Sequence, residues 1–369
     1  MPNNPPKQSL LFRLHIDVPL LIGLLAIMLL GLAVMYSASG ENHKQVVRQL
    51  IHIGIACGGM FIFAQIPPMV YRHWTVAVFV VGIALLVAVL VFGHVGKGAQ
   101  RWLDLGFIKF QPSELMKLAV PMMVSWYLSR YHLPSTFKHI FFGFILMAIP
   151  TLLIAKQPDL GTSILIASSG FFALFLSGMS WSLLLFLAAL APVALWVLWS
   201  FFMHTYQKQR VLTFLDPETD PLGSGYHIIQ SKIAIGSGGL EGKGWLHGTQ
   251  SQLEFIPERH TDFIFSVFSE EFGLVGVIVL LAIYLFIVAR GMYISVRAQD
   301  TFGKLLAGSI TMTFFVYVFV NIGMVSGLLP VVGVPLPLVS YGGTSMVTLM
   351  LGFGVLMSIS THRRLLASN

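Results

Sequence analysis

Ten apolar segments dominate this sequence, and each is about long enough to cross a lipid bilayer as a helix. A spanning helix needs about 20 mostly apolar residues. Over half of the 369 residues are apolar and only 10% are charged, which is too little polar surface for a soluble domain. We therefore expect an all-α polytopic membrane protein, a single transmembrane domain over residues 1–369. The predicted spans are 18–35, 50–66, 74–92, 112–131, 139–155, 160–176, 181–203, 262–288, 305–325 and 338–359.

An even number of spans places both termini on one side of the membrane. Lys and Arg in short loops favour the cytoplasmic side. Ten of them fall on the side of the termini and seven on the other, a weak bias that predicts cytoplasmic termini. The opposite side is still unusually basic, which suggests an anionic partner there.

A long polar loop, residues 204–262, separates the seventh and eighth spans and is expected on the periplasmic side. Its piece 226–235 is amphipathic and predicts an interfacial helix. At its end, Glu258, Arg259, His260 and Asp262 crowd the mouth of an apolar span. Ionisable groups at such an edge favour a functional site. A solvated loop end that marks the membrane boundary explains them equally well.

Charged residues also begin the fourth span. Glu114 falls in the first helical turn after Pro112, where the helix dipole favours an acid. Lys117 follows three residues later, so both side chains share one face. They form either part of a site or a self-satisfied ion pair.

Two further short stretches combine cations with a constrained backbone. Lys156 and Asp159 flank Pro158 between the fifth and sixth spans, where a simple turn is the plainer interpretation. Lys208 and Arg210 open the long loop and would bind lipid headgroups in general or one diphosphate in particular.

Prolines and small polar residues fill the stretch 329–345 before the tenth span. Backbone amides at a helix N-terminus suit an anion, whereas small residues also serve helix packing, which we favour. Asn321, in the ninth span, is expected to form a hydrogen bond between helices.

Several classes of function are excluded by the sequence. It has no HxxxH or CxxC metal spacing, no nucleotide-binding glycine loop and no GxSxG motif. The basic residues are scattered singly, so we set nucleic acid aside as a partner. Cys57 is the single cysteine, which precludes an intramolecular disulfide.

Taken together, separated motifs resemble the SEDS family (shape, elongation, division and sporulation) of bacterial cell-wall proteins. The resemblance covers the whole chain, and the short N-terminus and residues 242–250 are similar to the elongation branch rather than the division branch. The motifs are Arg101-Trp102, Gln111-Pro-Ser-Glu114 with Lys117, Gln157-Pro-Asp-Leu-Gly161, the stretch 257–264 and the stretch 335–343.

This resemblance implies a peptidoglycan glycosyltransferase that polymerises lipid II at the periplasmic face of the inner membrane, among membrane lipids. It implies a class B penicillin-binding protein (a transpeptidase) and other elongation-complex membrane proteins as partners. The family's essential acid falls on Asp262, and its ion pair falls on Glu114 and Lys117.

Inverting transfer from an α-diphosphate to a β-1,4 linkage needs one general base, for which we expect Asp262. The expected substrate-binding residues around it are Arg101, Glu114, Lys117, Lys156, Asp159, Arg210, Glu258, Arg259 and His260. No cofactor is evident, although Mg²⁺ or Mn²⁺ could help the basic residues to stabilise the leaving diphosphate. A lipid II flippase and a non-catalytic scaffold for the penicillin-binding protein are the alternatives.

Overall fold

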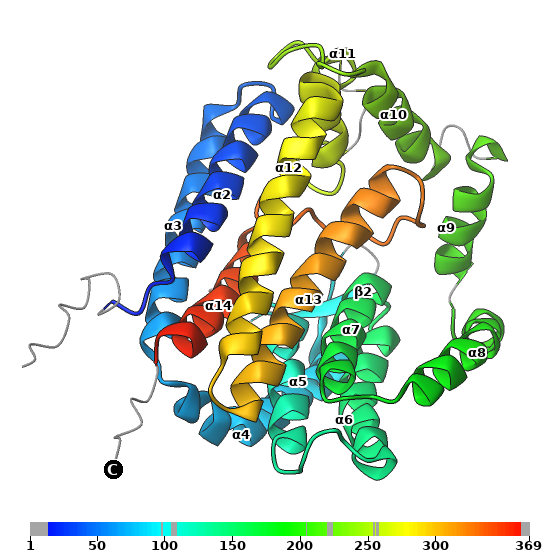
Figure 1. Cartoon of the computed structure of the whole chain (residues 1–369). Helices are drawn as coiled ribbons and strands as arrows, with labels where there is room; N and C mark the ends of the chain where they lie inside the picture. The colour runs from blue at the N-terminus through cyan, green and yellow to red at the C-terminus, as the bar shows by residue number, and fades with distance from the viewer. Residues whose placement is uncertain are drawn as a thin grey trace, which may run out of the picture.

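The computed structural model describes residues 14–96, 99–104, 109–203, 205–219, 224–253, 255 and 258–362. Every predicted span has a helix at its place (Figure 1). Eight of these helices meet the length and hydropathy of a membrane span, with α8 counted together with the turn that follows it, and α5 and α7 have 17 residues each. The ten are α2 (Val18–Ala38), α3 (His43–Gln65), α4 (Pro68–Phe92), α5 (Pro112–Leu128), α6 (Phe137–Lys156), α7 (Leu160–Leu176), α8 (Trp181–Val197), α12 (Ile264–Arg297), α13 (Thr301–Val325) and α14 (Gly343–Thr361).

Three predicted boundaries need correction. Helix α8 continues into a π-helical turn, Leu198–Phe202. Helix α12 extends to Arg297, beyond the predicted end at 288, and is broken at Gly273. Helix α14 begins at Gly343 rather than 338, because the prolines keep the preceding segment non-helical.

A small antiparallel sheet lies between α4 and α5 and was not predicted. Its strands are β1 (His94–Gly96), β2 (Ala99–Asp104) and β3 (Lys109–Phe110), in the order β1-β2-β3. Leu103 pairs with Phe110, which fixes the register of β2 against β3. Strand β2 carries Arg101 over the bundle toward the start of α7, where the guanidinium bonds the Pro158 carbonyl.

The described part of the long loop contains three α-helices, α9 (Thr205–Leu215), α10 (Ser224–Ser237) and α11 (Thr249–Gln252), with a 3-10 turn, Pro217–Thr219, after α9. Helix α10 covers the amphipathic piece 226–235. The Ser231 hydroxyl of α10 donates to the Val325 carbonyl at the end of α13 over 2.6 Å. This bond satisfies a helix-terminal carbonyl and docks α10 on the bundle.

The described ends of the chain lie side by side, which confirms that they share one side of the bundle. Arg290 Nη2 lies 2.9 Å from Asp17 Oδ2, and Ser360 donates to the same carboxylate. The rings of His15 and His362 stack with centroids 3.7 Å apart. In Figure 1 these ends lie at the lower left, away from α10 and α11 at the top.

Helix α8 stands away from the other helices, on the right of Figure 1, and none of its residues is buried. The buried apolar side chains form two main clusters. One draws mainly on α2, α3, α12, α13 and α14, and the other mainly on α4, α5, α6 and α7. The residues of the candidate site come from both groups.

Candidate functional site

The loop 258–263 leads into α12 and is held by α13 and by the non-helical segment before α14. Asn321 Nδ2 donates to the Asp262 carbonyl over 2.9 Å and to the Val334 carbonyl over 2.7 Å. The Ser340 hydroxyl donates to the Thr261 carbonyl over 2.6 Å, and the Tyr341 amide donates to the His260 carbonyl over 2.8 Å. These bonds fix the backbone that carries Asp262.

The partly buried Asp262 carboxylate lies beside Gly333. A Cβ built on Gly333 would be 3.6 Å from Asp262 Oδ2, and the Gly333 φ of 74° lies in the left-handed region that favours glycine. The positive φ is therefore the reason that glycine suits this position, and the short distance shows that the Asp262 carboxylate lies directly beside it.

Gly333 also lines a cavity of about 100 Å³. Arg101 comes to this cavity from β2 and Arg210 from α9, and Arg210 Nη1 donates to the Val331 carbonyl over 3.3 Å. The fold thus gathers two guanidinium groups on the same small cavity as the glycine that adjoins Asp262. The other lining residues are Pro158, Leu160, Met203, Gln207, Val211, Pro330, Val331 and Val332.

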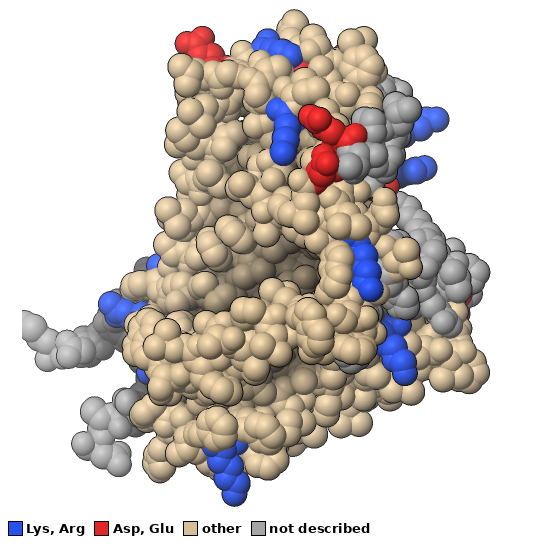
Figure 2. Space-filling model, turned by 90° about the vertical axis from the view of Figure 1, so that its right-hand side faces the viewer, with Lys and Arg blue, Asp and Glu red and all other residues tan. Residues whose placement is uncertain are grey.

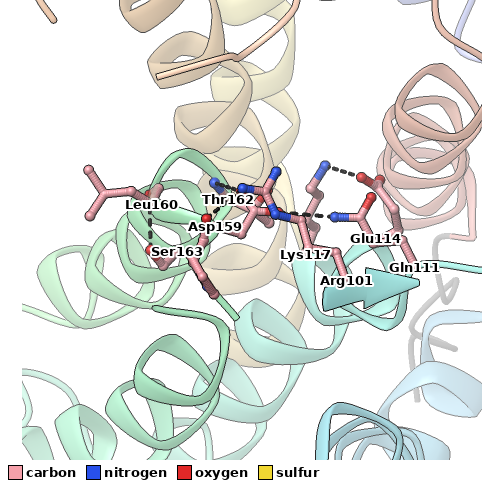
Figure 3. A network of polar contacts seen from close by, with 9 residues as sticks. Arg101, Gln111, Glu114, Lys117, Asp159, Leu160, Thr162 and Ser163 are labelled. Carbon is pink, nitrogen blue, oxygen red and sulfur yellow. Dashed lines mark hydrogen bonds and ion pairs between the residues drawn. The ribbon is translucent and has the colours of Figure 1, made fainter. Parts of the chain in front are cut away.

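A polar network runs from this cavity to α5 (Figure 3). Asp159 is the N-cap of α7, and its Oδ1 accepts the Thr162 amide over 3.3 Å. Its Oδ2 accepts Gln111 Nε2 over 3.1 Å and lies 3.7 Å from Arg101 Nε. Asp159 therefore caps helix α7 and also orients the Arg101 guanidinium at the cavity.

The Glu114–Lys117 pair predicted from the sequence is present on α5. Lys117 Nζ lies 2.6 Å from Glu114 Oε1, and both side chains are almost completely buried. Lys117 Nζ also lies 5.3 Å from the centroid of the Tyr317 ring on α13. Mutual pairing allows two charges to remain inside the bundle, and Tyr317 connects the pair to α13.

Glu114 and Gln111 also face a second, larger cavity of about 790 Å³ between α3, α4, α5 and α14. Its walls are mostly apolar, and His52 and Thr344 add polar groups. The network of Arg101, Asp159, Gln111, Glu114 and Lys117 therefore lies between the small basic cavity and the larger, mostly apolar cavity.

The remaining predicted site residues lie around this centre. Glu258 accepts the Thr261 hydroxyl, and Arg259 Nη2 would be 3.6 Å from a Cβ on Gly40, beside the end of α2. Lys156 ends α6 with an exposed side chain and is not among the residues that line either cavity. The structure brings Arg101, rather than Lys156, to Asp159.

Two histidines adjoin the loop. The His227 ring of α10 stacks on Phe263 with centroids 5.7 Å apart, and the sequence had given no reason to select it. Burial, more than the nearby Arg210, lowers the pKa of His227 against an opposing effect of Glu258. Burial, and then Arg259, lowers the pKa of His260. The folded protein therefore favours the neutral form of both rings.

Among the described residues, no three His, Cys, Asp or Glu side chains converge as a metal site.

The face seen in Figure 2, the right-hand side of Figure 1, is hollowed in the middle. The hollow is surrounded mostly by uncharged residues, and the acidic side chains on this face gather in its upper half. The uncharged surface around the hollow suits the apolar part of a lipid, and the charged side chains above it suit a more polar environment.

Comparison with known proteins gives consistent matches. Residues 9–365 match the model of the FtsW, RodA and SpoVE family, described as cell cycle proteins. The chain is 56% identical over 369 residues to the peptidoglycan glycosyltransferase MrdB of Escherichia coli, and all of both chains is covered. It is 36% identical over 370 residues to the probable peptidoglycan glycosyltransferase FtsW of Trichlorobacter lovleyi, with 96% of each chain covered.

Two solved structures have the same fold. One is a chain from a study of how a peptidoglycan synthase complex coordinates polymerisation and crosslinking. It has a TM-score of 0.81 and 32% identity, with 93% of this chain and 97% of that chain covered. The other is the rod-shape-determining protein RodA of Thermus thermophilus, with a TM-score of 0.70 and 26% identity over 93% of this chain and 96% of that chain.

Proposed function

The chain belongs to the family of cell-cycle proteins that includes FtsW, RodA and SpoVE, and we propose that it polymerises lipid II with Asp262 as the general base. It is an integral membrane protein and a peptidoglycan glycosyltransferase of the RodA type. The family and branch predicted from the separated motifs are confirmed.

The proposed reaction is a single in-line displacement. The donor sugar is linked through its anomeric carbon to a lipid diphosphate, and the acceptor is the 4-hydroxyl of GlcNAc on a second lipid II. The hydroxyl oxygen bonds to the anomeric carbon as the bond to the diphosphate breaks, which inverts the configuration. Asp262 takes the hydroxyl proton, and the lipid diphosphate leaves with the bonding electron pair. No covalent enzyme intermediate is needed.

One observation carries this proposal: Arg101 and Arg210 line the cavity whose glycine wall adjoins the Asp262 carboxylate. Fixed cations aimed at a developing charge are often the largest contribution to catalysis. We assign the leaving diphosphate to these two arginines, with Arg259 and Lys156 nearer the outer boundary. Glu258 and His260 shape the loop, and the Glu114–Lys117 pair and Asp159 support the wall of the site.

The small cavity is lined by Leu160 at the start of α7, Arg210 of α9 and Gly333 after α13, toward the end of the bundle away from the described termini. We propose that this end is periplasmic and that the termini are cytoplasmic, in the inner membrane. For the crosslinking step we propose a class B penicillin-binding protein as partner, since a similar chain was solved in a study of a peptidoglycan synthase complex.

The test is glycan formation from purified lipid II in detergent, with the chain copurified with a partner whose transpeptidase serine is inactivated. Asp262→Asn is nearly isosteric and should lower the rate by about 10²–10⁴-fold, because a positioned base is lost. Glu218→Gln, an exposed acid of the long loop, is the matched control and should retain wild-type activity.

Equal polymer from wild type and Asp262→Asn would remove Asp262 as the base. An intact complex that makes no polymer with either chain would favour the flippase, which would use the same anionic lipid. Unchanged cell shape with Asp262→Asn, while partner binding persists, would favour the scaffold.

A further inference from the structure

Helix α12, which begins just after Asp262, consists of two helical pieces. Gly273 has φ 61° and ψ −164°, and this conformation separates residues 264–272 from the longer piece that follows. Backbone groups released by such a break need partners inside the protein, since lipid offers none.

Residues 239–244 of the long loop supply those partners. The amides of Lys243 and Gly244 donate to the carbonyls of Glu270 and Glu271, both over 3.0 Å. In the other direction, Leu274 donates to the Gly239 carbonyl over 3.0 Å, and Val275 donates to the Leu240 carbonyl over 3.1 Å. The loop therefore bonds both sides of the break.

Glycines allow this close approach of two backbones. A Cβ on Gly242 would lie 2.1 Å from the Glu271 carbonyl oxygen, and one on Gly238 would lie 2.1 Å from that of Ser269. Both distances are far too short for a side chain. Glycine at both positions therefore lets the loop backbone contact this turn of α12 directly.

The Glu270 carboxylate fastens the same junction through side chains. It is completely buried, and its Oε1 accepts Lys243 Nζ over 2.7 Å, the Gln250 amide over 2.9 Å and the Thr249 hydroxyl over 3.1 Å. A buried carboxylate is costly without a paired cation. Lys243 therefore ties the loop to α12 at the last full turn before the break.

The short piece 264–272 is held at both ends by these contacts. Its start is held through Asp262 and Thr261 by Asn321 and Ser340, and its end is held by the loop. Every residue from Ile264 to Glu271 is buried. A catalytic group must stay within about 0.5 Å of its working position, and a helix broken at Gly273 could pivot without the second attachment.

We propose that Lys243 and Glu270 are positioning residues for polymerisation, which hold the piece 264–272 and thereby the Asp262 carboxylate in its working position. The proposal rests on the function proposed above. One ion pair and four backbone hydrogen bonds then make the position of the catalytic acid depend on the position of the long loop.

The test measures kcat and KM for lipid II with Lys243→Gln, Lys243→Arg and the exposed neighbour control Glu241→Gln. Misplacement of a reacting group by about 1 Å costs about 10²-fold in rate. Lys243→Gln should therefore lower kcat by about 10- to 100-fold and change KM by less than about 2-fold. Lys243→Arg keeps the cation and should recover most of kcat, and Glu241→Gln should match wild type.

If Lys243→Gln does not fold, the double variant Lys243→Met with Glu270→Gln removes both charges together. It should restore the yield of folded protein while kcat stays low. Wild-type kcat in either folded variant, or a rise in KM alone, would overturn the proposal. Wild type and Asp262→Asn assayed in parallel report on the proposed function itself, so the two failures are distinguishable.

Discussion

The buried amide of Asn321 joins the two backbone segments that form the wall of the site. Its Nδ2 bonds the carbonyl of Asp262 and that of Val334, next to the glycine beside the Asp262 carboxylate. Leaving such carbonyls without a donor costs about 1–3 kcal/mol each. The sequence predicted a hydrogen bond between helices here, which is wrong in detail, because both acceptors lie in the non-helical segments before α12 and α14. It also gave no sign that one acceptor belongs to the residue proposed as base.

Local spacing accounts for what the sequence predicted at this scale. The Glu114–Lys117 pair lies within one helical turn, and the cluster 258–262 lies within one loop, so both were visible as patterns. The contact of Arg101 with Asp159 joins residues far apart in the chain, and it depends on a strand that was not predicted. Spacing gives no information about such a contact.

The two histidines beside the loop predict how stability varies with pH. His227 and His260 have folded-state pKa values lowered from 6.5, mainly by burial. Below pH 6.5 the unfolded chain therefore binds more protons, so their contribution to stability is complete above that pH and declines as pH falls through the lowered pKa values.

We expect hydrogen exchange of the loop amides, corrected for intrinsic rates, to quicken as the pH falls below 6.5. His227→Gln should flatten this dependence, and exposed His132→Gln should leave it unchanged. An equal pH dependence in His227→Gln and wild type would contradict the assignment of this pH dependence to His227.

At the scale of elements, hydropathy predicted every spanning helix because lipid requires continuous apolar helices. It missed the break at Gly273, the β1-β2-β3 sheet and the length of the segment before α14. At Gly273 and before α14, backbone groups bond to distant parts of the chain, as Leu274 does to Gly239, whereas the three strands pair with one another within residues 94–110. The hydropathy of one stretch does not show whether another segment will supply partners for the backbone groups that a continuous helix would bond.

Helix α7 meets the wall of the small cavity through Gly161. A Cβ there would lie 2.8 Å from the Val332 carbonyl oxygen, a backbone atom that cannot move without the cavity wall. Gly161→Ala should therefore lower polymerisation by about tenfold, on the order of 1.4 kcal/mol in the activation free energy. The measurement is the initial rate at equal folded yield.

Gly58→Ala is the matched control for this substitution. A Cβ on Gly58 of α3 meets nothing within 4 Å, and alanine favours a helix by up to about 1 kcal/mol over glycine. Its rate should equal wild type and its thermal midpoint should not fall. Full activity of Gly161→Ala would show that the wall tolerates displacement.

Across the whole molecule, the site lies where the two groups of helices meet. Asp262, Asn321 and Gly333 belong to the group of α12, α13 and α14, whereas Arg101, Asp159 and Glu114 belong to the group of α4 to α7. Arg101 lies on one group and Asp262 on the other, and Arg210 reaches the cavity from α9. All three can act on one substrate only if the two groups hold their relative position. Tyr317 of α13, over Lys117 of α5, is one contact that fixes it.

The same arrangement makes a topological prediction, because the basic cavity works on periplasmic lipid II only if the described termini face the cytoplasm. In a Cys57→Ser background, Glu218→Cys places a thiol in the long loop, and His132→Cys places one between α5 and α6. An impermeant maleimide added to spheroplasts should label Glu218→Cys at once and His132→Cys only after permeabilisation. The reverse pattern would place the acid and its arginines in the cytoplasm, where the leaving lipid diphosphate would be released on the wrong side of the membrane for glycan synthesis.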